Sequence, residues 1–119
     1  MSQKNTLLRT PTMWGKYQAK EPQDGCFICD AEPLEEFDHW KIIWNDYPYD
    51  AVASRHYMLV PLKHVATRAT VPPQASKELG AILDTLEHTK RYDCILENFT
   101  RARSQQTHYH LHLIQWRRQ

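Results

Sequence analysis

Residues 107–116 (THYHLHLIQW) begin with a strict alternation of histidines and apolar residues, and this pattern limits the folds open to the chain. Histidines occupy positions 108, 110 and 112, and Tyr109, Leu111 and Leu113 alternate with them. Successive side chains of a β-strand point to opposite faces, so this period of two predicts a strand with all three imidazoles on one face. The other face can pack against a core.

A row of three imidazoles makes a poor core surface, because each buried neutral ring needs partners for two nitrogens. The row therefore favours a site that surrounds a shared anionic ligand or a metal ion. Two other interpretations remain open: a solvent-exposed strand face that is rich in histidine, and a plain three-histidine metal site.

The composition bounds the kind of protein. The 119 residues have the length of one domain, and 15 basic residues nearly balance 14 acidic ones, for a net charge of +1. This balance argues against a protein whose main task is binding duplex nucleic acid. No apolar run approaches the ~20 residues of a membrane span, and no apolar segment follows the first residues. We therefore expect no membrane association and a cytoplasmic location.

The pattern of apolar residues predicts an α+β domain with a mainly antiparallel sheet of about five strands and one or two helices. Helical spacing of apolar residues predicts a helix from residue 75 to about 88. We expect an irregular N-terminal arm over residues 1–22 and the folded domain over residues 23–119. The segments expected to be strands are 37–44, 56–61, 92–99 and 107–116.

Three motifs resemble those of one protein family. The segment 108–114 (HYHLHLI) matches His-φ-His-φ-His-φ-φ, the signature of the histidine triad (HIT) superfamily. The segment 55–64 (RHYMLVPLKH) is similar to the family's G-H-x-L-V-I-P-K-x-H, and the segment 26–29 (CFIC) resembles the two-cysteine entry of its zinc-bearing bacterial members. The order and spacing of all three agree. The resemblance implies a HIT-like fold for the domain.

The resemblance also implies a nucleotidyl hydrolase that acts at an α-phosphate of a nucleoside phosphoramidate or dinucleoside polyphosphate. By position, His110 matches the nucleophile that forms a nucleotidyl-histidine intermediate. His112 would stabilise phosphate charge, and His56 would complete the basic site. The third position is histidine rather than glutamine, which favours the hydrolases over the transferase branch. A dinucleoside polyphosphate phosphorylase and a nucleotide-binding or scaffolding module with little turnover remain as alternatives.

The family's nucleotide-contacting positions match a set of loop residues here, and the implied partner is a purine nucleotide or dinucleotide. Arg101, Ala102 and Arg103 replace the glycines that the family has before its phosphate-binding serine or threonine. These arginines either contact further phosphates or belong to a solvated loop. Family members are usually homodimers, so a homodimer is expected. The residues with implied nucleotide contacts are Asn45, Tyr47, Asn98, Ser104 and Gln105.

The cysteines at positions 26 and 29 have the spacing of half a zinc site. In the zinc-bearing members the other two ligands match His64 and His108, so the resemblance implies a structural zinc held by Cys26, Cys29, His64 and His108. The alternative is a pair of reduced cysteines in a turn. The third cysteine, Cys94, is expected to be a small buried apolar residue in a strand.

Overall fold

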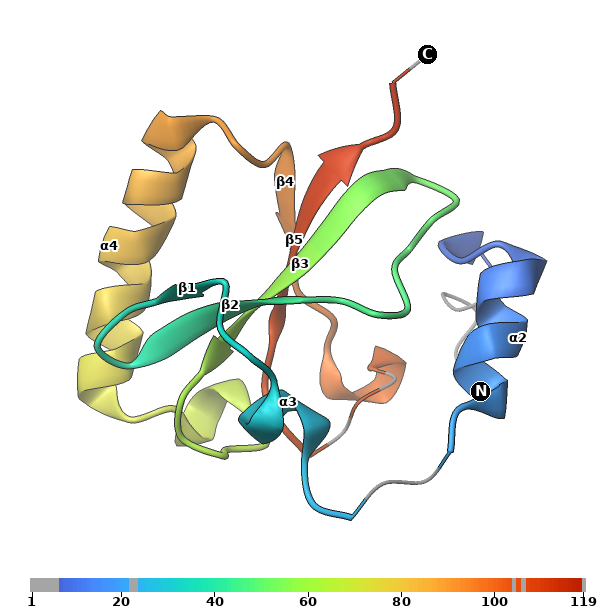
Figure 1. Cartoon of the computed structure of the whole chain (residues 1–119). Coiled ribbons are helices and arrows are strands. Elements are labelled where there is room, and N and C mark those ends of the chain that lie inside the picture. The colour runs from blue at the N-terminus through green and yellow to red at the C-terminus, as the bar shows by residue number, and fades with distance from the viewer. Residues whose placement is uncertain (1–6, 22–23, 104, 106, 119) are drawn as a thin grey trace.

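The histidine-rich strand lies inside an antiparallel sheet of five strands. The computed structural model describes residues 7–21, 24–103, 105 and 107–118. The strand order is β1-β2-β3-β5-β4, and every neighbouring pair is antiparallel. This arrangement confirms the expected α+β architecture (Figure 1). The strands are β1 (Glu35–Glu36), β2 (Trp40–Trp44), β3 (Ala53–Pro61), β4 (Cys94–Leu96) and β5 (Leu111–Trp116).

One face of the sheet carries the main core beneath helix α4 (Pro73–Thr89). Leu111 and Leu113 of β5 are buried there, as the alternation predicts. The helix contributes Ala75, Ile82 and Leu86 to the same cluster. Its first turn begins with proline, where a missing N–H costs little, and it ends at the left-handed residue that follows Thr89.

The opposite face of the sheet receives the N-terminal segments. Helix α3 (Phe27–Asp30) places Ile28 against Ile43, Met58 and Val60. Helix α4 and the N-terminal helix α2 (Pro11–Ala19) lie on opposite sides of the sheet (Figure 1). The histidine face of β5 is therefore the face that α2 and α3 cover.

The register of β3 against β5 brings two histidines together. Met58 lies opposite His112, and His56 lies opposite Ile114. His56 is two residues from Met58, so it shares a face with His112 and is its diagonal neighbour. Packing of the apolar face against α4 fixes this register, because a slip by one residue would reverse both faces.

The expectation of an irregular arm over residues 1–22 is wrong in its central part, because Pro11–Ala19 form helix α2. Thr10 caps the helix by accepting a hydrogen bond from the Met13 N–H at 3.2 Å, and Pro11 occupies the first turn. None of the helical residues is buried, so the sequence carries no apolar stripe that would indicate a helix.

The strand limits also differ from expectation. Strand β5 begins at Leu111, so His108 and His110 precede it. The reason is local: the Tyr109 N–H donates to the Val65 carbonyl at 2.7 Å instead of to a neighbouring strand. Strand β4 covers only three residues of the expected 92–99. No helix in the described part of the chain has the length and apolar character needed to cross a membrane.

Candidate functional site

The three histidines of the motif divide between two adjoining sites. His108 turns toward the two cysteines of the N-terminal segment, and its ring centroid lies 4.9 Å from that of His64. His110 and His112, whose ring centroids are also 4.9 Å apart, line a pocket.

The first site is a cluster of two thiols and two imidazoles. Cys26, Cys29, His64 and His108 each offer one ligand atom, and all four atoms lie within 4.8 Å of one another. The Sγ to Nδ1 distances are 3.5 Å for Cys26–His108, 3.5 Å for Cys29–His108 and 3.2 Å for Cys29–His64. A tetrahedral zinc with ordinary bond lengths separates its sulfur and nitrogen ligands by about 3.5 Å. The donor set and its spacing therefore fit zinc.

The surroundings of this cluster orient its ligands. The His108 Nε2–H donates to the Pro61 carbonyl at 2.9 Å, which fixes the ring so that Nδ1 faces the cysteines. Burial lowers the pKa of His108, which keeps the ring neutral, as a metal ligand must be. The buried Lys41 ammonium donates to the carbonyls of Cys29 and Ala31, and so holds the end of α3 in place.

The second site is built around His110, whose side chain is 4% exposed. Its Nδ1 lies 2.9 Å from the His108 carbonyl oxygen. A carbonyl can only accept, so the proton of the neutral ring is on Nδ1 and the lone pair is on Nε2. The unprotonated nitrogen of a neutral imidazole is a nucleophile at neutral pH.

His112 and His56 form a hydrogen-bonded ring with one tyrosine. The Tyr49 backbone N–H donates to His56 Nδ1 at 2.9 Å. The proton of neutral His56 is therefore on Nε2, which lies 2.8 Å from His112 Nδ1 and donates to it. His112 then carries its proton on Nε2, 3.1 Å from the Tyr49 hydroxyl oxygen. One backbone donor thus sets the tautomers of both imidazoles.

Two asparagines adjoin this ring. The Asn98 Nδ2 group donates to the Tyr49 hydroxyl oxygen at 3.1 Å and lies 3.3 Å from His112 Nε2. The Asn45 Oδ1 accepts from the Tyr47 N–H at 2.8 Å, and Asn45 is buried. The Asn45 Nδ2 group lies 3.4 Å from His56 Nε2, so both asparagines lie beside the histidine pair, and their contact with a nucleotide stays a prediction.

Tyr49 is a residue whose role the sequence did not reveal. It is an aromatic residue in the loop before β3, and none of the three sequence motifs includes it. Its side chain is 1% exposed, and burial raises its pKa to about 12, so the hydroxyl stays protonated. Only the register of β3 and β5 shows that its hydroxyl and backbone contact both histidines of the pair.

We expect Tyr49→Phe to lower the free energy of unfolding by about 1 kcal/mol, because His112 Nε2–H and the Asn98 amide lose their shared acceptor. Urea denaturation measures this loss, and ¹⁵N NMR of the imidazoles reports the His112 tautomer. Tyr47→Phe is the matched control, because Tyr47 contacts Arg9 and Asn45 through its backbone. Equal stability of both variants would contradict the ring of hydrogen bonds.

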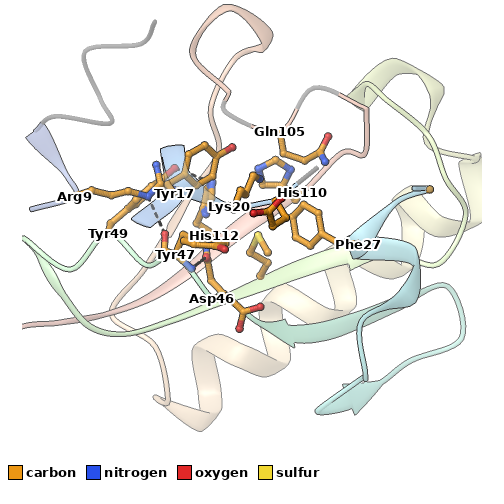
Figure 2. A pocket seen from close by; sticks show the side chains of 14 residues that line it. Arg9, Tyr17, Lys20, Phe27, Asp46, Tyr47, Tyr49, Gln105, His110 and His112 are labelled. Atoms are coloured by element: carbon orange, nitrogen blue, oxygen red, sulfur yellow. Dashed lines mark hydrogen bonds between the residues drawn. The ribbon is translucent and has the colours of Figure 1, made fainter. Parts of the chain in front are cut away.

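The pocket beside these histidines has a volume of about 380 Å³. That volume is in the range of about 300–1,000 Å³ found for small-molecule sites. Figure 2 shows His110, Gln105 and Phe27 close together, with Arg9 and Tyr49 farther along the pocket. The lining residues are Arg9, Tyr17, Lys20, Glu21, Gly25, Phe27, Asn45, Asp46, Tyr47, Tyr49, Met58, Gln105, His110 and His112.

The residues expected to bind phosphate, and the arginine before them, lie in different surroundings. Gln105 lines the pocket and accepts from the Thr107 N–H, whereas Ser104 lies outside the described residues. Arg103 is buried and donates to the Ala66 carbonyl at 2.8 Å and to the Thr100 hydroxyl at 3.1 Å. These contacts give Arg103 a structural role and explain its absence from the pocket lining.

Comparison with known sequences does not assign the chain to a family. No model of a known protein family matches the chain. It is 29% identical over 72 residues to an uncharacterized protein of Chlamydia muridarum (strain MoPn / Nigg), a match that covers 56% of this chain and 18% of that protein. An uncharacterized protein of Chlamydia trachomatis serovar D is 29% identical over 70 residues, which cover 55% of this chain. The match spans less than a fifth of the length of either relative, 18% in both.

Comparison with solved structures is more informative. A histidine triad protein from Clostridium difficile superposes with a TM-score of 0.59 at 17% identity, covering 83% of this chain and 96% of the other. A HIT family hydrolase from Legionella pneumophila Philadelphia 1 gives 0.59 at 24% identity and covers 79% and 95%. A histidine triad nucleotide-binding protein from Candida albicans gives 0.57 at 19% identity and covers 75% and 73%. The chain therefore has the fold of the histidine triad proteins.

Proposed function

We propose that the protein is a nucleotidyl hydrolase that acts at the α-phosphate of a nucleoside phosphoramidate or a dinucleoside polyphosphate, with His110 as the nucleophile. The observation that carries the proposal is the hydrogen bond from His110 Nδ1–H to the His108 carbonyl, which puts the lone pair on Nε2 of a pocket-lining ring. The structurally similar Legionella and Candida proteins, a hydrolase and a nucleotide-binding protein by name, support it.

The reaction would proceed in two displacements at phosphorus. His110 Nε2 forms a bond to the α-phosphorus while the bond to the leaving group breaks, and the leaving group takes that electron pair and a proton from solvent. Water then attacks the same phosphorus and gives up a proton to solvent, the phosphorus–nitrogen bond breaks with its electron pair returning to Nε2, and the nucleoside monophosphate and neutral His110 are released. The two steps together replace one difficult displacement with two easier ones.

His112, His56 and Asn98 would position and stabilise the phosphoryl group. The fixed tautomer of His112 presents Nε2–H as a donor, and the Asn98 amide provides a second donor beside it. A phosphate oxygen that displaces the Tyr49 hydroxyl would accept from both groups. His56 would hold the His112 ring through the bond to Nδ1. Donors fixed in advance cost little reorganisation when charge develops.

The remaining parts of the proposal rest on the sequence resemblance. Asn45, Tyr47, Gln105 and Ser104 would bind the nucleotide, which we expect to be a purine nucleotide. A homodimer and a cytoplasmic location are expected on the same basis. Zinc bound by the cysteine–histidine cluster would tie α3 to the segments that carry His64 and His108, and would therefore act structurally.

Trapping the covalent intermediate tests the proposal. Protein mixed with AMP-phosphoramidate and quenched within milliseconds is expected to carry one nucleotidyl group on His110, labile in acid and stable in base. Peptide mass spectrometry measures the site. Binding without an adduct or product would favour a binding module. Formation of a nucleoside diphosphate from a dinucleoside polyphosphate and inorganic phosphate would favour a phosphorylase. An adduct on another residue would contradict the assignment of His110.

A further inference from the structure

The N-terminal helix α2 forms one wall of the pocket and is fastened at its start to the loop before β3. The Thr10 N–H and hydroxyl donate to the two carboxylate oxygens of Asp50, each at 2.8 Å. Arg9, which is buried, donates from Nε to the Tyr47 carbonyl at 2.8 Å. Helix α2 lies outside the three sequence motifs. These hydrogen bonds join it to the pocket beside the histidines.

An aromatic cage lies where α2 meets the pocket. The Tyr17 ring of α2 contacts the Tyr47 ring edge to face, with centroids 5.4 Å apart. The Lys20 ammonium lies 4.2 Å from the Tyr17 centroid, 5.4 Å from that of Phe27 and 5.6 Å from that of Tyr47. Three rings from three separate segments thus surround one exposed cation at the border of the cavity.

We propose that Tyr17 selects the nucleobase of the substrate, and that a base entering the cage displaces the Lys20 ammonium. This inference rests on the proposed function, because it takes the ligand to be a nucleotide. A base and an ammonium compete for the same faces of the aromatic rings. The base stacks on these faces, and the ammonium is attracted to them by the ring quadrupole. The lysine stem is flexible and its head is exposed, so the exchange requires no change in the backbone.

The charges of this wall favour a base over a further phosphate. Glu21 and Asp46 line the pocket beside Lys20, so a second anion would approach two carboxylates. The Arg9 guanidinium already faces the rings of Tyr17 and Tyr49, at 4.6 and 4.9 Å from their centroids. A neutral planar base avoids the repulsion from the acidic residues and gains the aromatic surface.

The test compares the affinity of the full chain for AMP with that for ribose 5-phosphate, which lacks the base, by isothermal titration calorimetry. Tyr17→Ala is expected to lower the affinity for AMP by about tenfold and to leave the affinity for ribose 5-phosphate unchanged, because the variant loses base stacking and keeps the phosphate contacts. Tyr17→Phe, which keeps the ring, should retain AMP affinity. Lys16→Ala, at an exposed position of the same helix outside the pocket lining, is the matched control.

Lys20→Ala separates displacement from phosphate binding. We expect AMP to bind about threefold more tightly, because the competing cation is gone, with ribose 5-phosphate unchanged. An equal loss of affinity for both ligands in Lys20→Ala would make Lys20 a phosphate ligand and would overturn the inference. An unchanged AMP affinity in Tyr17→Ala would also overturn it. If the unaltered protein bound neither ligand, the proposed function would fail and the inference with it. AMP binding with no effect of Tyr17→Ala would refute the inference alone.

Discussion

Replacement of His110 by alanine is expected to lower the rate of AMP-phosphoramidate hydrolysis by about three orders of magnitude or more, because it removes the attacking nitrogen. The fold should survive. The neighbours Tyr109 and Leu111 pack on the opposite face beneath α4, and the lost ring lies at the pocket. Steady-state rates measure the first effect, and urea denaturation followed by circular dichroism measures the second.

Two further variants sharpen this test. His39→Ala removes an exposed imidazole and keeps the backbone hydrogen bonds of this residue to Glu78 and Leu62, so it should leave the rate unchanged. His112→Ala should raise the barrier by roughly 3 kcal/mol, because it removes stabilisation of the transition state and leaves the nucleophile in place. Near-normal turnover of a folded His110→Ala protein would contradict the covalent route and would direct attention to the cysteine–histidine cluster.

Much of the fold follows from hydrophobic periodicity in the sequence. The alternation at residues 107–116 predicts a strand with one apolar face, and Leu111 and Leu113 are buried beneath α4 as that pattern requires. The helical spacing that predicts residues 75–88 matches α4 to within two residues at each end. Both elements bury a continuous apolar face, and the residues of such a face recur at a regular spacing in the sequence.

The parts that the sequence did not predict depend on contacts between distant residues. Helix α2 buries none of its residues and is held by the Thr10 cap and by Asp50, 40 residues away. Tyr49 contacts His112 across 63 residues, through a register that only the folded sheet defines. Neither contact produces a local period. Hydrogen bonds of this kind therefore appear only once the chain is folded.

The candidate site was predictable to a different degree in its two halves. The alternation predicts a shared face for His110 and His112, and the structure places both at the pocket, although His110 lies just before β5. The grouping of Cys26 with His108 joins residues 82 positions apart, and no spacing rule implies it. The resemblance to zinc-bearing proteins implies that pairing, and the four ligand atoms lie within 4.8 Å of one another, close enough to hold a metal ion.

Zinc should stabilise the folded protein strongly, because the unfolded chain has no preformed site and binding energy therefore becomes folding energy. At a free zinc concentration 1,000 times the dissociation constant, one site adds about 4 kcal/mol to the free energy of unfolding. Removal of zinc should then lower the midpoint of thermal unfolding by roughly 15 °C. Differential scanning calorimetry before and after dialysis against a chelator measures this shift.

The control variants separate a metal site from a pair of ordinary thiols. Elemental analysis should find one zinc per chain in the unaltered protein and in Cys94→Ala, since Cys94 lies outside the cluster in β4. Cys29→Ala should lose most of the zinc, because that sulfur contacts both His64 and His108, and chelation should no longer change its unfolding midpoint. Protein that contains no zinc and has three readily titrated thiols would contradict the metal assignment. His108 would then be a histidine hydrogen-bonded to reduced cysteines.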